Sequence, residues 1–186
     1  MRIGGGSAGG RKVGNRRRGR RGEAGLRPTS SRVRLAIFSM LGPETLSGLS
    51  VLDLYAGTGA LGLEALSRGA DTAEFVDQNE RRCRDIQEAA IHLGFGDQVT
   101  VRRGRCERVI ISLTNRYDVV FIDPPYADDP FAKVMSNLDE SLVLNPGALI
   151  FAEHSRRTDL EDRYGSLKRT DSRTYGDTAV STYTFP

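Results

Sequence analysis

Short apolar runs and amphipathic segments alternate along most of the chain. Residues 119–122 and 148–152 are uninterrupted apolar runs of strand length, whereas Ile86, Ala90 and Leu93 recur at the spacing of one helix face. This pattern predicts strands over 50–54, 72–76, 98–102, 117–122 and 148–153. It predicts helices over 60–67, 79–93, 107–113 and 128–138.

The two flanks of this alternating region follow other patterns. Thr29 or Ser30 can cap a helix that carries Val33 and Ile37 on its apolar face and ends at Gly42. Thr, Tyr and Val alternate toward the C-terminus, so residues 165–185 are predicted to form two paired strands without a crossover helix.

Strand–helix alternation implies right-handed crossovers and a parallel sheet that is covered on both faces. We therefore predict an α/β fold: a Rossmann-like, doubly wound, mostly parallel seven-stranded sheet with helices on both faces and an antiparallel hairpin at its C-terminal edge. Ligands of such sheets bind at the carboxyl ends of the strands. The residues that carry the chemistry are therefore expected directly after strands.

Positive charge is concentrated at the start of the chain. Residues 1–34 hold eleven of the 27 Lys and Arg residues but only one of the 24 acidic residues, so they carry +10 while the rest carries −7. Such an arm favours a polyanionic partner, because cationic side chains release the counterions of a phosphate backbone. We predict a basic Gly- and Arg-rich arm or hairpin over residues 1–26 and one domain over 27–186. A solubilising tail and an organelle transit peptide are the alternatives for the arm.

Several classes of protein are not expected. No apolar run is long enough to span a bilayer, and the basic start lacks the apolar segment of a signal peptide, so we predict a cytoplasmic protein without a membrane partner. Cys83, Cys106, His92 and His154 show no metal-ligand spacing, so we predict reduced thiols and no metal. We expect a monomer.

A glycine-rich turn follows the first strand of the alternating region. Gly57, Gly59 and Gly62 form a GxGxxG motif, and Asp77 follows at the end of the next strand. Glycine lets the backbone approach a ligand closely, the helix N-terminus offers free N–H groups, and a carboxylate can accept both ribose hydroxyls. The motif fits a nicotinamide dinucleotide and S-adenosylmethionine equally well. Asp53 favours S-adenosylmethionine, because a carboxylate there suits a cationic amine and would repel a pyrophosphate.

A second motif, Asp123-Pro124-Pro125-Tyr126, follows a later strand. The prolines stop the strand and leave their carbonyls free as acceptors, while Tyr126 adds a ring for stacking. Together these groups suit a planar substrate that bears an NH₂ group. Acceptors from Asp123 and the Pro124 carbonyl can draw an exocyclic amine toward tetrahedral geometry and expose its lone pair to a methyl donor. The target base must leave its stack to enter.

These motifs resemble those of the bacterial 16S ribosomal RNA guanine-N2 methyltransferases, over nearly the whole chain. The similarity lies in the opening segment, in the Arg27-Pro28-Thr29 region, in the sequence of residues 53–70 and in the 123–126 motif. The resemblance implies formation of N2-methylguanine, at nucleotide position 966 of 16S RNA, on an assembled or assembling small subunit. The 123–126 motif alone is shared with DNA adenine methyltransferases.

The resemblance and the motifs together give three sets of candidate residues. The catalytic candidates are Asp123, Pro124, Pro125 and Tyr126. The candidates for binding S-adenosylmethionine are Asp53, Tyr55, Gly57, Thr58, Gly59, Asp77, Gln78, Arg105 and Cys106. The candidates for contacting RNA are Arg11, Lys12, Arg16, Arg17, Arg18, Arg20, Arg21, Arg27, Thr29, Arg32 and Arg34.

The chain departs from the family at one cofactor position. Related enzymes usually have an Asp that contacts the adenine where Arg105 stands, and a guanidinium cannot accept a hydrogen bond from the adenine amine. Adenine contacts are then expected from the backbone or from elsewhere. Glu153 and His154 are interpreted as structural groups. The alternative functions are an adenine-N6 DNA methyltransferase, a nicotinamide-dependent enzyme and a non-catalytic RNA-binding assembly factor.

Overall fold

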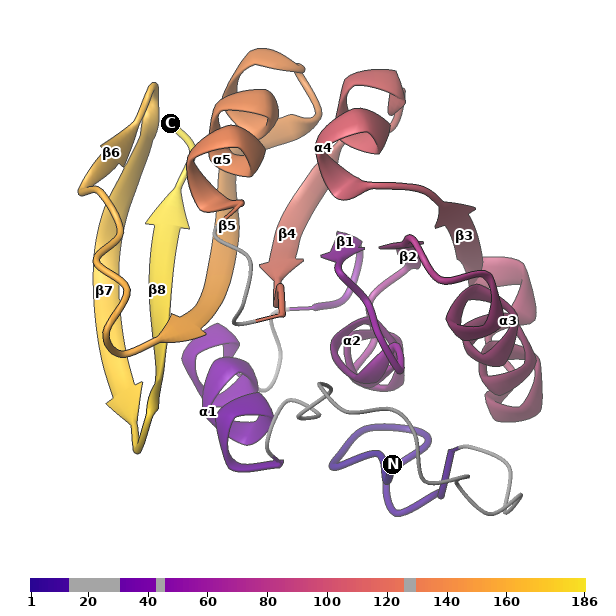
Figure 1. Cartoon of the computed structure of the whole chain (residues 1–186). Coiled ribbons are helices and arrows are strands. Elements are labelled where there is room, and N and C mark those ends of the chain that lie inside the picture. The colour runs from indigo at the N-terminus through magenta and orange to yellow at the C-terminus, as the bar shows by residue number, and fades with distance from the viewer. Residues whose placement is uncertain (14–30, 43–45, 126–129) are drawn as a thin grey trace.

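The computed structural model describes residues 1–13, 31–42, 46–125 and 130–186. These residues form an eight-stranded sheet in the order β3-β2-β1-β4-β5-β8-β7-β6 (Figure 1). The strands are β1 (Ser50–Leu54), β2 (Thr72–Asp77), β3 (Val99–Arg103), β4 (Tyr117–Ile122), β5 (Leu144–Ser155), β6 (Arg163–Tyr164), β7 (Leu167–Tyr175) and β8 (Thr178–Thr184). The helices are α1 (Ser31–Leu41), α2 (Ala60–Ser67), α3 (Glu80–Leu93), α4 (Cys106–Val109) and α5 (Phe131–Glu140), with 3₁₀ turns η1 (Gly96–Gln98) and η2 (Ile110–Ser112).

Strands β1 to β5 pair in parallel, and β8 and β7 add antiparallel pairs beyond β5. This arrangement confirms the predicted doubly wound sheet with an antiparallel C-terminal edge. It differs from the prediction in having eight strands, because the two-residue β6 pairs with the start of β7. The chain order reverses between β1 and β4, where such sheets open a crevice at the strand ends.

Strand β5 begins at Leu144, earlier than the predicted start at residue 148. Its pairing with β4 shifts between Tyr117, which lies opposite Leu144, and Val119, which lies opposite Leu149. The extra residues bulge at Asn145-Pro146-Gly147, and Gly147 has a φ of 82°. Because these three residues interrupt the apolar run, the sequence pattern does not reveal the first part of β5.

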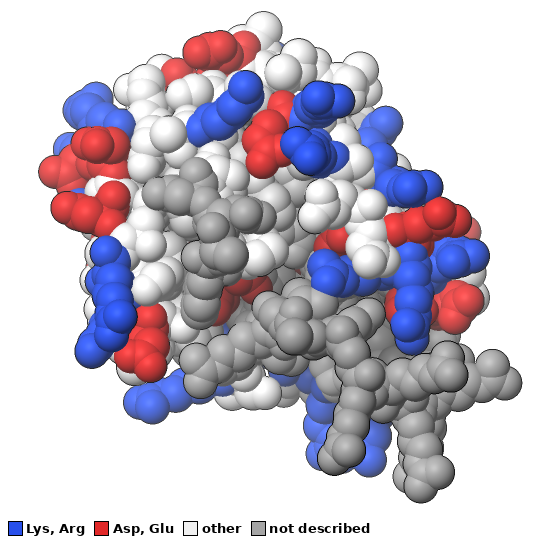
Figure 2. Space-filling view, in the orientation of Figure 1, with Lys and Arg blue, Asp and Glu red and all other residues white. Residues whose placement is uncertain are grey.

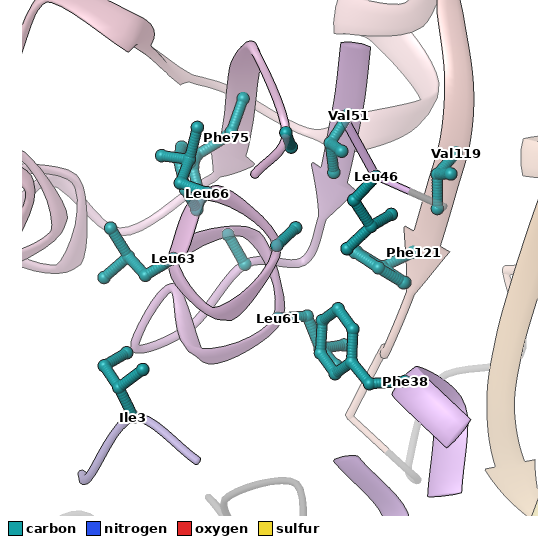
Figure 3. Close-up of a cluster of buried hydrophobic side chains, with 14 of the residues drawn as sticks. Ile3, Phe38, Leu46, Val51, Leu61, Leu63, Leu66, Phe75, Val119 and Phe121 are labelled. Atoms are coloured by element: carbon teal, nitrogen blue, oxygen red, sulfur yellow. The ribbon is translucent and has the colours of Figure 1, made fainter. Parts of the chain in front are cut away.

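Successive side chains of each strand point to opposite faces of the sheet, and so contribute to two apolar layers. Val119 and Phe121 pack with α1, α2 and α3, whereas Val120 and Ile122 pack with α4 and α5 on the other face. Figure 1 shows α1 and α2 on one side of the sheet and α4 and α5 on the other. In the first layer Phe38 of α1 meets Phe121 edge-on, with 5.8 Å between ring centroids (Figure 3).

The first thirteen residues pack against this core through three buried side chains. Ile3, Ala8 and Val13 are buried, and the backbone N–H of Ser7 donates to the carbonyl of Ser67 at 2.7 Å. Gly6 must be glycine, because its φ is +74° and an added Cβ would lie 1.7 Å from the Ser67 oxygen. This part of the predicted arm is therefore held on α2, while residues 14–26 lie outside the described residues.

Glu64 on α2 joins three segments. Its carboxylate is fully buried and accepts hydrogen bonds from the Gly4 N–H at 2.6 Å and from Arg68 at 2.9 Å. The buried Arg34 of α1 approaches it at 3.7 Å and donates to the Arg2 carbonyl at 2.8 Å. One carboxylate thus neutralises two cations where α1, α2 and the opening segment meet.

No helix in the described part of the chain combines the length and apolarity that a membrane crossing requires.

Replacing Glu64 with Gln is expected to lower the free energy of unfolding by about 3 kcal/mol, the scale for removing one partner of a buried ion pair. The loss arises because the buried Arg34 guanidinium keeps its charge without a counter-charge. Urea denaturation of both proteins measures the difference. Glu88→Gln, on the exposed face of α3, is the control and should change stability little. Equal effects of the two substitutions would contradict this role of Glu64.

Candidate active site

Four carboxyl groups line the carboxyl edge of four neighbouring strands, on the face that α1 and α2 cover. Phe75, Phe121 and Phe151 lie in the first apolar layer, so Asp77 and Glu153, two residues further along their strands, point to the same face. Asp53 lies opposite Phe75 and Phe121. Asp123 directly follows β4, and its charge raises the pKa of both Asp53 and Glu153. The predicted strand-end residues are therefore brought together.

Asp53 is the most buried of these four carboxyl groups. Its side chain is 2% exposed and accepts a hydrogen bond from the Gly62 N–H at 2.9 Å. Burial raises its pKa well above the ordinary value, and the charges of Asp123 and Asp77 add to this, although the bond from Gly62 opposes it. A cationic ligand would offset both the cost of burying the Asp53 carboxylate and its repulsion by Asp123 and Asp77, because it supplies the opposite charge in the low-dielectric interior.

The glycine loop lies directly after Asp53. Gly57 and Gly59 have φ values of 56° and 72°, and the Gly57 N–H donates to Asp77 at 2.9 Å. An added Cβ at Gly57 would meet only the Tyr55 carbonyl within 4 Å, so the loop presents bare backbone on that side. Gly62 serves packing instead, because a Cβ there would lie 2.3 Å from Phe75.

Tyr55 fixes the loop to α4. It is not glycine, yet it has a φ of 58°, and its hydroxyl donates to Glu107 at 2.7 Å. Its N–H donates to the sulfur of the buried Cys106 at 3.3 Å. Burial raises the pKa of the Cys106 thiol to about 12, so the group is a neutral packing partner at physiological pH. Hydrogen bonds from the backbone N–H and from the side-chain hydroxyl of Tyr55 thus hold its strained backbone in place at the glycine loop.

Asp77 accepts hydrogen bonds through both oxygens. Besides Gly57, it accepts from the Asn79 N–H at 2.8 Å, and Arg82 approaches it at 3.5 Å. Its neighbour Gln78 is exposed, as is Thr58 in the loop. A carboxylate fixed in this way at the end of β2 suits ribose hydroxyls.

These residues fit S-adenosylmethionine. Asp53 suits its cationic methionine end, the Gly57 backbone allows close approach, and Asp77 suits its ribose. The exposed Arg105 is the N-cap residue of α4, and its side chain makes no capping hydrogen bond there. Within the described ranges no group of His, Cys, Asp and Glu side chains has the arrangement of a metal site.

The two prolines of the Asp-Pro-Pro segment line a small pocket where β4 and β5 end. Pro124 and Pro125 line the pocket together with Phe131, Glu153 and His154. Asp123 is half-buried, and its N–H points to the Leu54 carbonyl at 3.5 Å. Tyr126 lies outside the described residues. Three of the four predicted catalytic residues thus lie at the same edge as the predicted cofactor residues.

Glu153 and His154 are both interpreted from the sequence as structural groups. The ring nitrogens of His154 lie 2.9 Å from the Ser155 carbonyl and 2.9 Å from the Ser181 hydroxyl, which supports that interpretation for His154. Glu153 differs. Its side chain is buried, its Oε2 has no hydrogen-bond partner in the described structure, and burial together with Asp123 raises its pKa to about 8. Glu153 lies beside Asp123, which follows the neighbouring strand, and only the pairing of β4 with β5 reveals this position.

The candidate RNA contacts divide into several kinds. Arg11 donates to the carbonyls of His92 and Leu93 at 2.6 and 3.1 Å, at the C-terminal end of α3. Arg34 is only 6% exposed and anchors α1 beside Glu64, which argues against its predicted contact with RNA. Lys12 and Arg32 are exposed. The remaining candidates lie outside the described residues: Arg16, Arg17, Arg18, Arg20, Arg21, Arg27 and Thr29.

Charges on the visible face of the domain are mixed. Figure 2 shows Lys and Arg side chains interspersed with Asp and Glu. On this face the described residues form no broad surface of one sign. By sequence, the excess positive charge of the chain resides in its first 34 residues.

Comparison with known proteins identifies the family of the chain. The family model described as "Conserved hypothetical protein 95" matches residues 1–184. The chain is 35% identical over 160 residues to "Putative rRNA methyltransferase YlbH" of Bacillus subtilis, covering 84% of this chain and 86% of the relative. It is 32% identical over 147 residues to "Ribosomal RNA small subunit methyltransferase D" of Escherichia coli, covering 77% and 73%.

Solved structures share this fold. A structure described as "Putative methyltransferase yhhF from Escherichia coli" superposes with a TM-score of 0.86 at 26% identity, and covers 100% of this chain and 97% of the other. A conserved hypothetical protein of Streptococcus pyogenes is 34% identical with a TM-score of 0.77, over 83% and 96%. The chain belongs to the family described as Conserved hypothetical protein 95, the family of the small-subunit ribosomal RNA methyltransferase D proteins.

Proposed function

We propose that this protein transfers a methyl group from S-adenosylmethionine to the exocyclic N2 of a guanine in 16S ribosomal RNA. The target is nucleotide position 966, the position that the family resemblance implies. The observation that carries the proposal is the position of Asp123-Pro124-Pro125, which follows β4 beside the buried Asp53 and the glycine loop. An amine-accepting motif and a site for a cationic methyl donor thus share one edge of the sheet. The relatives named as ribosomal RNA methyltransferases support the class of substrate.

The proposed chemistry depends mainly on placement. S-adenosylmethionine supplies an electrophilic methyl group when it is bound. Asp123 and the Pro124 carbonyl accept hydrogen bonds from the two hydrogens of the target amine and turn its lone pair toward that methyl group. The same acceptors stabilise the positive charge that develops on the nitrogen during transfer. No dedicated base is required, because the methylated amine sheds its extra proton readily.

The substrate surface includes the basic start of the chain. Residues 1–13 are fixed to α2 and lead into a segment with five arginines, at positions 16, 17, 18, 20 and 21. Such a segment suits the phosphate backbone around a base that has left its stack. The partner is then 16S RNA in a small subunit or its assembly intermediate, and the predicted cytoplasmic location follows from that substrate.

The reaction is tested with labelled S-adenosylmethionine and small subunits that lack the modification, followed by nucleoside analysis. Label in N2-methylguanosine is expected. Asp123→Ala should reduce the rate by at least about 100-fold, because it removes an acceptor that is aimed at developing charge, while binding of S-adenosylmethionine persists. Asp159→Ala, an exposed position in the loop between β5 and β6, is the matched control. Label in adenine, or full activity of Asp123→Ala, would contradict the proposal.

The role of the basic segment is tested by replacing its five arginines with glutamine. Residues 1–13 stay in place, because deleting them would remove core side chains such as Ile3. The affinity for small-subunit RNA should fall, and the slope of log K against log salt should shrink by up to about 0.7–0.9 for each phosphate that the variant no longer neutralises. Arg163→Gln with Lys168→Gln, at the far edge of the sheet, is the control. An unchanged slope would rule out this role.

A further inference from the structure

Glu153 is a buried carboxyl group without a full set of partners. The side chain is 5% exposed, and Oε2 has no hydrogen-bond partner in the described structure. An unpaired polar atom in the interior is costly and uncommon, so each instance requires an explanation. In this molecule the unpaired atom belongs to a residue that lines the pocket of Pro124 and Pro125. A polar group that reaches Oε2 from beside Pro124 and Pro125 would be its missing partner.

The position of Glu153 relative to Asp123 follows from the sheet. Ile122 of β4 lies opposite Ala152 of β5, so the next residue of each strand is Asp123 and Glu153. The charge of Asp123 acts on Glu153, which places the two carboxyl groups in one electrostatic site. Asp123 is the proposed acceptor for the target amine, so Glu153 is a second polar group beside that amine.

The other charged groups near Glu153 have partners elsewhere. His154, the next residue, faces Ser155 and Ser181. On β8 the residue opposite Glu153 is Val180, which is apolar and buried. Asp53 interacts with Asp123 from β1. In the described residues, therefore, no cation compensates Glu153.

Purine bases differ in the group that lies next to the exocyclic amine. Guanine carries an N1–H donor beside its 2-amine, whereas adenine carries a bare N1 acceptor beside its 6-amine. A carboxylate next to the amine site accepts a hydrogen bond from the guanine N1–H and repels the lone pair of the bare adenine N1. On the basis of the proposed function, we propose that the Glu153 carboxylate accepts the N1–H hydrogen bond of the target guanine and thereby selects guanine over adenine.

This role predicts a dependence of activity on pH. The pKa of Glu153 is raised to about 8, so the carboxyl group is mostly protonated at neutral pH and becomes a pure acceptor as the pH rises. The kcat/KM of the wild-type protein should therefore increase about tenfold per pH unit below pH 8 and then level off. Glu153→Gln should remove this rise and lower kcat/KM on the plateau by about 10- to 100-fold. Glu161→Gln, an exposed carboxyl group in the following loop, should keep the wild-type profile.

A base analogue tests the selection directly. 2-Aminopurine carries the 2-amine of guanine but a bare N1, so it is placed at the target position of the RNA in place of guanine. Above pH 8, where Glu153 is mostly ionised, the wild-type protein should strongly prefer guanine. Glu153→Gln should narrow that preference by about tenfold or more, because a carboxamide NH₂ can donate to the bare N1. A purely structural Glu153 would leave this ratio unchanged.

The stability of the variant provides a separate readout. Because the folded pKa of Glu153 lies above its ordinary value of 4.5, its contribution to stability is fully present below pH 4.5 and is lost as the pH rises through about 8. The Glu153→Gln variant does not lose this stability as the pH rises, because a carboxamide does not ionise. Its unfolding midpoint should match the wild type near pH 4.5 and exceed it at pH 8.

The outcomes separate this inference from the proposed function. Wild-type protein that makes no N2-methylguanosine would overturn the proposed function, and this inference with it. Wild-type protein that makes the product with a flat pH profile would overturn the role of Glu153 alone. The same holds if Glu153→Gln folds and retains both the wild-type pH profile and the wild-type preference for guanine over 2-aminopurine.

Discussion

Mutual repulsion among buried carboxyl groups is the constraint on which this molecule depends. Asp53, Asp77, Asp123 and Glu153 lie at the carboxyl ends of four adjacent strands, and the pKa values of Asp53 and Glu153 rise because of burial and of the neighbouring carboxylates. No fold gains stability from such an arrangement alone. In the function proposed above, a cationic methyl donor at one end of this row and an amine-bearing base at the other would relieve the repulsion, so that a cost in the free protein would become binding and selectivity in the complex.

Much of this arrangement could be predicted from the sequence. The period of the apolar residues located nearly all strands and helices, because a parallel sheet that is buried on both faces requires continuous apolar strands. Asp53, Asp77 and Asp123 were predicted as site residues because they lie at the ends of those strands or directly after them, and parallel strands end at one edge. The match of the family model to residues 1–184 confirms the resemblance inferred from the motifs.

The remainder depends on contacts between segments that are distant in the chain. The bulge at Asn145-Pro146-Gly147 obscured the start of β5, and β6 is too short to leave a pattern. Arg34 was grouped with RNA contacts by its charge, yet its partner Glu64 lies 30 residues away on another helix. Glu153 follows the apolar run of its strand, and only the pairing of β4 with β5 reveals that it adjoins Asp123.

The central claim is that this row of carboxyl groups forms the site of a cationic methyl donor and not of a dinucleotide. Isothermal titration of the protein with S-adenosylmethionine and, separately, with NAD tests it most directly, with Asp53→Asn in parallel. The account predicts saturable binding of S-adenosylmethionine, weaker binding by Asp53→Asn and no binding of NAD. Saturable binding of NAD without binding of S-adenosylmethionine would contradict it, because a pyrophosphate would then occupy the edge where the buried carboxylates lie.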